Sequence, residues 1–191
     1  ASLDRELIRK SIHLLVALIP PLASLHFQLT MGLVAAGTLF YIAAETMRLA
    51  GFRVTLVSDL TVVAAREREC GFVLGPVTLG LGVMLALLLY PLPASVIAIY
   101  ALAFGDAAAS VIGMAFGGLR MPLNRTKTVA GSIACLSVVL LVTIVLTADP
   151  LWAIVVSAIA MMIEALSPRD FDNLLLPVGV GIVVHVIAAA M

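Results

Sequence analysis

The sequence predicts an all-α fold, a polytopic membrane protein with about seven transmembrane helices in one integral membrane domain over residues 1–191. The first observation is composition: 63% of the residues are hydrophobic and the mean hydropathy is +1.21. A soluble domain of this size would have too few polar residues to cover its surface. The second is that all eleven Lys and Arg residues gather in a few short segments between long apolar stretches. Charge is expensive in hydrocarbon, so these segments are expected outside the membrane core.

Seven helical spans are predicted, because the length of the apolar stretches, at about 1.5 Å per residue, suits a hydrocarbon core of about 30 Å. Prolines mark three boundaries: Pro20-Pro21 breaks or kinks the first span, Pro91 to Pro93 turn the chain after the third, and Pro150 opens the sixth. The sixth span is short enough to be tilted or partly buried. In chain order the spans are residues 7–27, 30–50, 71–90, 94–117, 129–148, 150–166 and 174–191.

The basic residues also predict the orientation. With the N-terminus in the cytoplasm, the loops over 51–70, 118–128 and 167–173 lie there too, and the opposite side carries no Lys or Arg. The positive-inside rule therefore favours an N-in, C-out, multi-pass protein whose chemistry lies at the cytoplasmic face. The loop over 51–70 is typical of an amphipathic helix on the membrane surface, or of a flap at the mouth of a lipid site.

The charge balance bears on partners. The formal net charge is zero, because eleven acidic residues match the eleven basic ones. Nucleic acids select a strong positive excess, so no nucleic-acid partner is expected. Mixed charges on one side fit a small anionic ligand held by basic side chains together with a divalent metal. No disulfide is expected between Cys70, at a loop end, and Cys135, within a span.

Four polar residues at the start of the first span share one helical face: Glu6, Arg9, Lys10 and His13. A snorkelling cationic anchor would explain Arg9 or Lys10 alone. Four polar groups in one stripe, with His13 a full turn deeper, favour a buried network instead.

A second pair, Glu45 and Arg48, lies one turn apart near the cytoplasmic end of the second span. An ion pair at this spacing is a common structural device. Glu45 is deep enough to need a partner when ionised, so structural and functional roles are equally open.

The fourth span carries a carboxylate inside an apolar helix. Asp106, Ser110, Gly113 and Gly117 share a face at steps of four, three and four residues. A lone carboxylate there is costly unless it is paired, neutral or bound to metal. The pattern predicts a carboxylate at the base of a groove of small residues, where a phosphate or a backbone approaches closely. A hydrogen-bonded packing aspartate is the alternative.

The segment that opens the fifth span combines basic side chains, hydroxyls and a glycine. Free N–H groups and the helix dipole favour an anion at such a helix N-terminus. An ordinary cap would explain a lone hydroxyl here. Beside the Asp106 helix, the segment predicts a phosphate site next to a metal. Its polar and small residues are Asn124, Arg125, Thr126, Lys127, Thr128, Gly131 and Ser132.

The junction after the sixth span carries three acidic residues, Glu164, Asp170 and Asp172, followed by Asn173. This set suits Mg²⁺, which prefers one or two carboxylates completed by substrate phosphates and waters. A solvated turn explains Asp170 equally well. It does not explain Glu164, which lies within the apolar sixth span.

Taken in order from about residue 6 to residue 177, these motifs resemble the CTP-dependent lipid kinase family of dolichol kinase, phytol kinase and CTP-dependent diacylglycerol kinase. The central block is also similar to CDP-diacylglycerol synthase, but that family's P-G-H-G-G and D-R-x-D signature is absent from the sequence. Both families usually carry a Glu at the position where this chain has Ala130. The role of that Glu carboxylate is therefore not carried over to this chain. The matching motifs are Glu6-x-x-Arg9-Lys10-x-x-His13, Gly105-Asp106-Ala107-Ala108-Ala109-Ser110 with Gly113 and Phe116-Gly117, Lys127-Thr128-x-x-Gly131-Ser132, and Glu164-Ala165 followed by Asp172-Asn173-Leu174-x-x-Pro177.

The resemblance implies transfer of the γ-phosphoryl group of CTP to the hydroxyl of a membrane alcohol, of polyprenol or phytol type or diacylglycerol, with Mg²⁺ as cofactor. Asp106 with Glu164 or Asp172 would hold the metal, and His13 and Asp106 are both open as the general base. The expected catalytic residues are Asp106, Lys127, His13 and Glu164. The expected nucleotide and phosphate contacts are Arg9, Lys10, Ser110, Arg125, Thr128, Gly131, Ser132 and Asn173.

Three rival classes stay open. A cytidylyltransferase would release pyrophosphate and form a CDP-lipid, whereas a kinase releases CDP. A transporter would place polar groups near the bilayer midplane and often shows internal repeats. A non-enzymatic scaffold would tolerate Asn and Gln at Asp106 and Glu164. The lipid alcohol, the preferred nucleotide and the presence of a homo-oligomer do not follow from the sequence.

Overall fold

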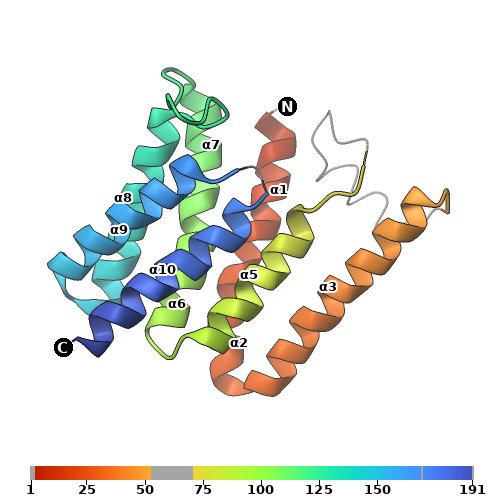
Figure 1. Cartoon of the computed structure of the whole chain (residues 1–191), viewed down its shortest axis with the longest axis horizontal. Coiled ribbons are helices and arrows are strands. Elements are labelled where there is room, and N and C mark those ends of the chain that lie inside the picture. The colour runs from red at the N-terminus through yellow and green to blue at the C-terminus, as the bar shows by residue number, and fades with distance from the viewer. Residues whose placement is uncertain (1–2, 53–70, 169, 191) are drawn as a thin grey trace.

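The computed structural model describes residues 3–52, 71–168 and 170–190, with side chains from residue 6 onward (Figure 1). These residues form helices joined by short loops, and there is no β-strand among them. The predicted all-α fold is confirmed for this part of the chain. The amphipathic helix or flap predicted over 51–70 lies, from residue 53 onward, outside the described residues.

Seven helical rods follow the seven apolar stretches, with boundaries that differ from the prediction by a few residues. The break expected at Pro20-Pro21 appears as a short 3₁₀ turn just before these prolines. The fourth rod contains a π-helical stretch in its middle. The first rod is α1 (Leu3–Leu15), η1 (Val16–Leu18) and α2 (Ile19–Leu25); the others are α3 (Phe27–Leu49), α5 (Gly75–Leu89), α6 (Ala94–Tyr100) with η2 (Ala101–Asp106) and α7 (Ala107–Phe116), α8 (Val129–Thr147), α9 (Pro150–Leu166) and α10 (Asp172–Ala189).

Five of these rods are long and apolar enough to cross a membrane, whereas α5 and α9 are shorter. The helices are therefore consistent with an integral membrane protein; the count of seven spans and the N-in, C-out orientation stay predictions. In Figure 1 the N-terminus lies at the same end of the bundle as the α7–α8 loop, and the C-terminus lies at the opposite end. The five long rods are Glu6–Leu25, Phe27–Leu49, Ala94–Phe116, Val129–Thr147 and Asp172–Ala189.

The fourth rod forms the core of the bundle. Ile97, Ile99 and Leu102 are fully buried there, and α10 packs against them through residues such as Leu176. Small residues allow the close helix contacts that membrane interfaces favour. A Cβ atom on Gly82 in α5, for example, would lie 2.1 Å from the carbonyl oxygen of Asn173 in α10.

The helix ends that carry polar residues lie at a similar level along the bundle. The helices α5 and α10 begin, and α9 ends, close to the level of Asp106, as the contacts of Gly75, Asn173 and Glu164 described below show. Beyond Asp106, α7 continues for 10 residues, or about 15 Å. In Figure 1 the first turns of α5 and α10 accordingly lie below the outer ends of α1 and α7. These three helix ends therefore lie at a similar level in the bundle, beside two helices that continue further.

Candidate functional site

The first part of the site joins α1 to the end of η2. Lys10 Nζ forms an ion pair with Asp106 Oδ2, and His13 Nε2 lies 3.3 Å from the same oxygen. Asp106 is 0% exposed, and both α1 side chains are buried as well. A π-helical turn often marks a functional site, and here it ends at the carboxylate. The α1 stripe and the Asp106 carboxylate, predicted separately, thus form one buried group.

Asn173 fixes the tautomer of His13. The Asn173 amide nitrogen donates to the carbonyl oxygen of Gly75, at 3.1 Å, and to Thr78 Oγ1, at 3.2 Å. A carbonyl only accepts hydrogen bonds, so the amide nitrogen must face α5 and the amide oxygen must face His13. That oxygen lies 2.8 Å from His13 Nε2, which therefore carries the proton and leaves Nδ1 as the basic nitrogen of the neutral ring. Sequence reasoning missed Thr78, because an ordinary threonine near a helix start gives no signal.

The second part of the site is centred on Lys127. Its Nζ lies 2.8 Å from Asp172 Oδ2 and 2.9 Å from Glu164 Oε1, and Ser132 Oγ donates to Glu164 Oε2 at 3.0 Å. Burial lowers the pKa of Lys127, but the charges of Asp172, Glu164 and Asp106 outweigh that effect and raise the pKa above the ordinary 10.5. Lys127 is therefore a permanent cation between two carboxylates.

Local backbone structure presents Lys127 to this group. The segment before α8 folds back as a hairpin, in which the N–H of Met121 donates to the Lys127 carbonyl at 3.0 Å and that of Val129 to the Leu119 carbonyl at 3.0 Å. Thr128 then caps α8 by accepting from the N–H of Gly131 at 3.1 Å. The amide of Asn124 ties the hairpin to the carbonyl of Ser167 at 2.9 Å.

The two parts of the site meet at the start of α10. Asp172, which pairs with Lys127, directly precedes Asn173, which contacts His13. Arg9 pairs with Glu6 on the α1 stripe. The site thus contains three cationic side chains and four carboxylates, and its formal net charge is −1 when His13 is neutral. We call these nine residues the polar cluster: Glu6, Arg9, Lys10, His13, Asp106, Lys127, Glu164, Asp172 and Asn173.

The carboxylates of the polar cluster are of the ligand type that Mg²⁺ prefers. Asp106 Oδ1 is buried and has no hydrogen-bond partner among the described residues, so it has a lone pair to offer a cation or a hydroxyl. Glu164 and Asp172 add the carboxylate oxygens that Mg²⁺ prefers. Within the described residues, no group of three or more His, Cys, Asp or Glu side chains is placed so that it could hold a metal ion. One or two carboxylates completed by substrate phosphates and waters is the usual arrangement for this ion.

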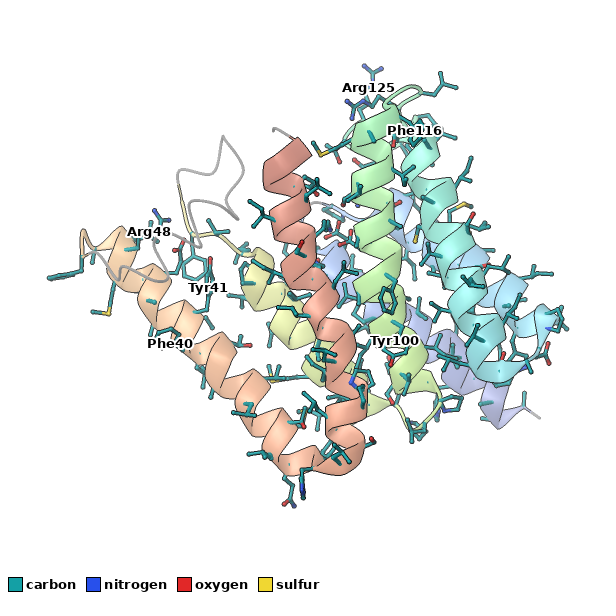
Figure 2. All side chains as sticks on the ribbon, turned by 180° about the vertical axis from the view of Figure 1, so that it is seen from behind. Phe40, Tyr41, Arg48, Tyr100, Phe116 and Arg125 are labelled. Carbon is teal, nitrogen blue, oxygen red and sulfur yellow. The ribbon has the colours of Figure 1, made fainter. Side chains whose placement is uncertain are left out.

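Some predicted site residues lie outside the polar cluster. Arg125 is exposed at the tip of the hairpin, beyond the end of α7 (Figure 2). Ser110 is partly buried on α7, three residues before Gly113, which packs against the start of α8. The groove of small residues is thus occupied by the start of α8: a Cβ atom on Gly113 would lie 2.6 Å from Thr128 Oγ1.

Glu45 and Arg48 also lie apart from the polar cluster and hold the end of α3 to the segment before α5. Their ion pair is bidentate, at 2.7 Å for both hydrogen bonds. Glu45 accepts further from the N–H of Val73 at 3.0 Å, and Arg48 donates to the carbonyl of Gly71 at 3.0 Å (Figure 2 labels Arg48). These contacts favour the structural role for the pair.

Comparison with known proteins gives no family for the chain. No protein-family model, no curated protein and no solved structure matches it. The evidence on function therefore comes from the residues and their geometry.

Proposed function

We propose that this protein is a CTP-dependent lipid kinase, which transfers the γ-phosphoryl group of CTP to the hydroxyl of a membrane alcohol. The observation that carries the proposal is the polar cluster itself. Two lysines, three carboxylates and a histidine from α1, η2, α9, α10 and the hairpin before α8 converge within an otherwise apolar helical bundle. Ionisable groups inside such a bundle are costly and are expected to have a function. Their types are those that phosphoryl transfer needs.

The reaction breaks the bond between the γ-phosphorus and the oxygen that bridges it to the β-phosphate. The hydroxyl oxygen of the lipid forms the new bond to that phosphorus, and CDP leaves. The hydroxyl proton goes to one of two acceptors in the polar cluster, Asp106 Oδ1 or His13 Nδ1. Both stay open as the general base.

The remaining residues position and neutralise charge. Lys127 is held as a cation between two carboxylates, and a phosphate would replace one of these contacts. Mg²⁺ would supply charge neutralisation when bound, with Asp106 and either Glu164 or Asp172 as the side chains that hold it. Lys10 and Arg9 place positive charge beside the Asp106 carboxylate.

The location also supports an interfacial reaction. The polar cluster lies where α5 and α10 begin and α9 ends, toward the end of the bundle that carries the N-terminus and the α7–α8 loop (Figure 1). We propose that this end faces the cytoplasm, since it carries the Lys and Arg residues of those segments. A nucleotide would then enter from water while the lipid enters from the bilayer.

The decisive experiment incubates the purified protein with CTP, ATP or GTP labelled at the γ-phosphate and with polyprenol, phytol or diacylglycerol. Label in the lipid from CTP, together with release of CDP, is the expected result. CTP labelled at the α-phosphate, offered together with a phosphorylated lipid such as phosphatidic acid, separates the main alternative, because a cytidylyltransferase would put that label into a CDP-lipid and release pyrophosphate. Transfer of neither label with any alcohol would contradict the proposal.

A further inference from the structure

The hairpin that carries Lys127 presents an unusual outer surface. Leu123 is 83% exposed, Leu119 is 79% exposed and Phe116, at its base, is 75% exposed. No other large apolar side chain in the described residues is more exposed than these three. Arg120 and Arg125 are exposed on the same hairpin, and the sequence from Gly117 to Lys127 contains no acidic residue.

The hairpin is a folded element and not an open loop. An isolated bridge pairs Arg120 with Thr128, and the N–H of Lys127 closes a turn onto the carbonyl of Asn124 at 3.0 Å. Lys127 points inward to the polar cluster, whereas the leucines and arginines point away from the protein. Because the backbone is fixed at both ends, the exposed side chains are held outward together.

The position of the hairpin between two membrane spans indicates which layer of the bilayer it contacts. It begins directly after the 23-residue span that ends at Phe116 and ends where the 19-residue span starts at Val129. Each span is close to the length that crosses about 30 Å of hydrocarbon. The hairpin therefore lies at the level of the lipid headgroups, where apolar side chains reach the acyl boundary and arginines reach phosphates.

We infer that this hairpin is a lipid-docking surface that inserts Leu119 and Leu123 into the leaflet next to the polar cluster and binds anionic headgroups through Arg120 and Arg125. The positive charge without acidic neighbours selects anionic over zwitterionic lipid. Docking would anchor the segment that holds Lys127 to the membrane surface. The inference needs only the membrane spans and does not depend on the proposed kinase activity.

Depth-dependent fluorescence tests the insertion. A Leu123→Trp variant in a Trp152→Phe background places the chain's single tryptophan at the tip of the hairpin. In phosphatidylglycerol vesicles, lipids that carry a quencher near the headgroup should quench this tryptophan, and aqueous iodide should quench it weakly. Strong iodide quenching without lipid quenching would show that the hairpin stands in water, as it would if it docked a soluble protein, and would overturn the inference. The parent protein, with Trp152 at the start of α9, serves as a control for the opposite end of the bundle.

A second measurement tests the arginines in the same Leu123→Trp variant. Quenching of the introduced tryptophan by spin-labelled phosphatidylglycerol should exceed quenching by spin-labelled phosphatidylcholine. The changes Arg120→Gln and Arg125→Gln should each reduce this preference roughly fivefold. Equal quenching by the two lipids in the protein with both arginines would contradict the anionic preference. If CTP abolished the lipid quenching, and if the arginine variants changed this effect of CTP, the hairpin would belong to the nucleotide site instead. That result would also overturn the inference.

Discussion

Replacing Lys127 with methionine separates its structural role from its catalytic role. In the structure the Lys127 ammonium neutralises Glu164 and Asp172, whose side chains are buried with it. The variant keeps most of the side-chain volume but leaves two carboxylates without their cation. Breaking a buried ion pair costs about 3–5 kcal/mol, and the 13% exposure of the Lys127 side chain places the expected loss near the lower end.

The kinase proposal predicts a separate loss of activity. Loss of a cation that neutralises the transferring phosphate lowers turnover by about 10²–10³-fold, and Lys127→Arg should rescue only part of it because a planar guanidinium does not replace a compact ammonium. The double variant Lys127→Met/Glu164→Gln removes one of the stranded charges. It should regain stability, with an interaction energy of about 0.5–3 kcal/mol, but it should regain no activity.

The assays are denaturant unfolding in detergent and steady-state kinetics with CTP on the same preparations. Recovery of turnover together with stability in the double variant would refute the catalytic role of Lys127. Near-normal turnover of Lys127→Met would refute it directly. Because the pKa of Lys127 is raised, its stabilising charge is fully present below the ordinary value of 10.5 and is lost only as pH rises above it. The stability difference between the parent protein and Lys127→Met should therefore stay constant from neutral pH up to that value.

Three further predictions concern the rest of the site and the topology. Asp106→Asn should lower CTP turnover by about 10²-fold or more and also destabilise the fold, because it strands a buried lysine partner; unchanged kinetics with saturating Mg²⁺ would make Asp106 structural. Asn173→Ala should weaken the Nε2–H tautomer of His13, because only the more distant Asp106 Oδ2 at 3.3 Å remains to accept from Nε2 among the described contacts, and the ¹⁵N shifts of the imidazole would show this; Thr78→Val should shift them less because the carbonyl acceptor of the amide remains. A cysteine at position 124, in a cysteine-free background, should resist impermeant thiol reagents added outside sealed cells; labelling from outside would contradict the N-in orientation.

Hydropathy and spacing could predict the rods and the α1 stripe. The apolar stretches are long, and the steps of four and three residues from Glu6 to Lys10 to His13 place them on one helical face whatever surrounds it. In the structure all three are buried, as a network requires. The need of Asp106 for a partner could also be predicted, because an unpaired carboxylate is too costly at that depth.

The partners themselves could not be predicted. Lys10 lies 96 residues from Asp106, and Lys127 lies 45 residues from Asp172, so these pairs depend on which rods pack together. The spacing after Asp106 predicted that a phosphate or a backbone approaches the small residues closely, but it did not indicate that the start of α8 takes this place at Gly113. The π-helical stretch that ends at Asp106 changes the local helical geometry, and apolar residues such as Leu102 carry no signal of it.

The short helices explain how so many charges are tolerated in an apolar bundle. At about 1.5 Å per residue, the 15 residues of α5 reach about 22 Å, less than the hydrocarbon thickness of about 30 Å. By length alone this would argue against α5 as a membrane span. Its first turn, however, lies at the polar cluster, where Gly75 accepts from Asn173, and α9 ends and α10 begins there too. The charged groups therefore lie nearer to one end of the bundle than to its middle, where the desolvation cost of a charge in a membrane is highest. Under the kinase proposal, a helix too short to span the bilayer would let a nucleotide from water meet a lipid hydroxyl from the bilayer.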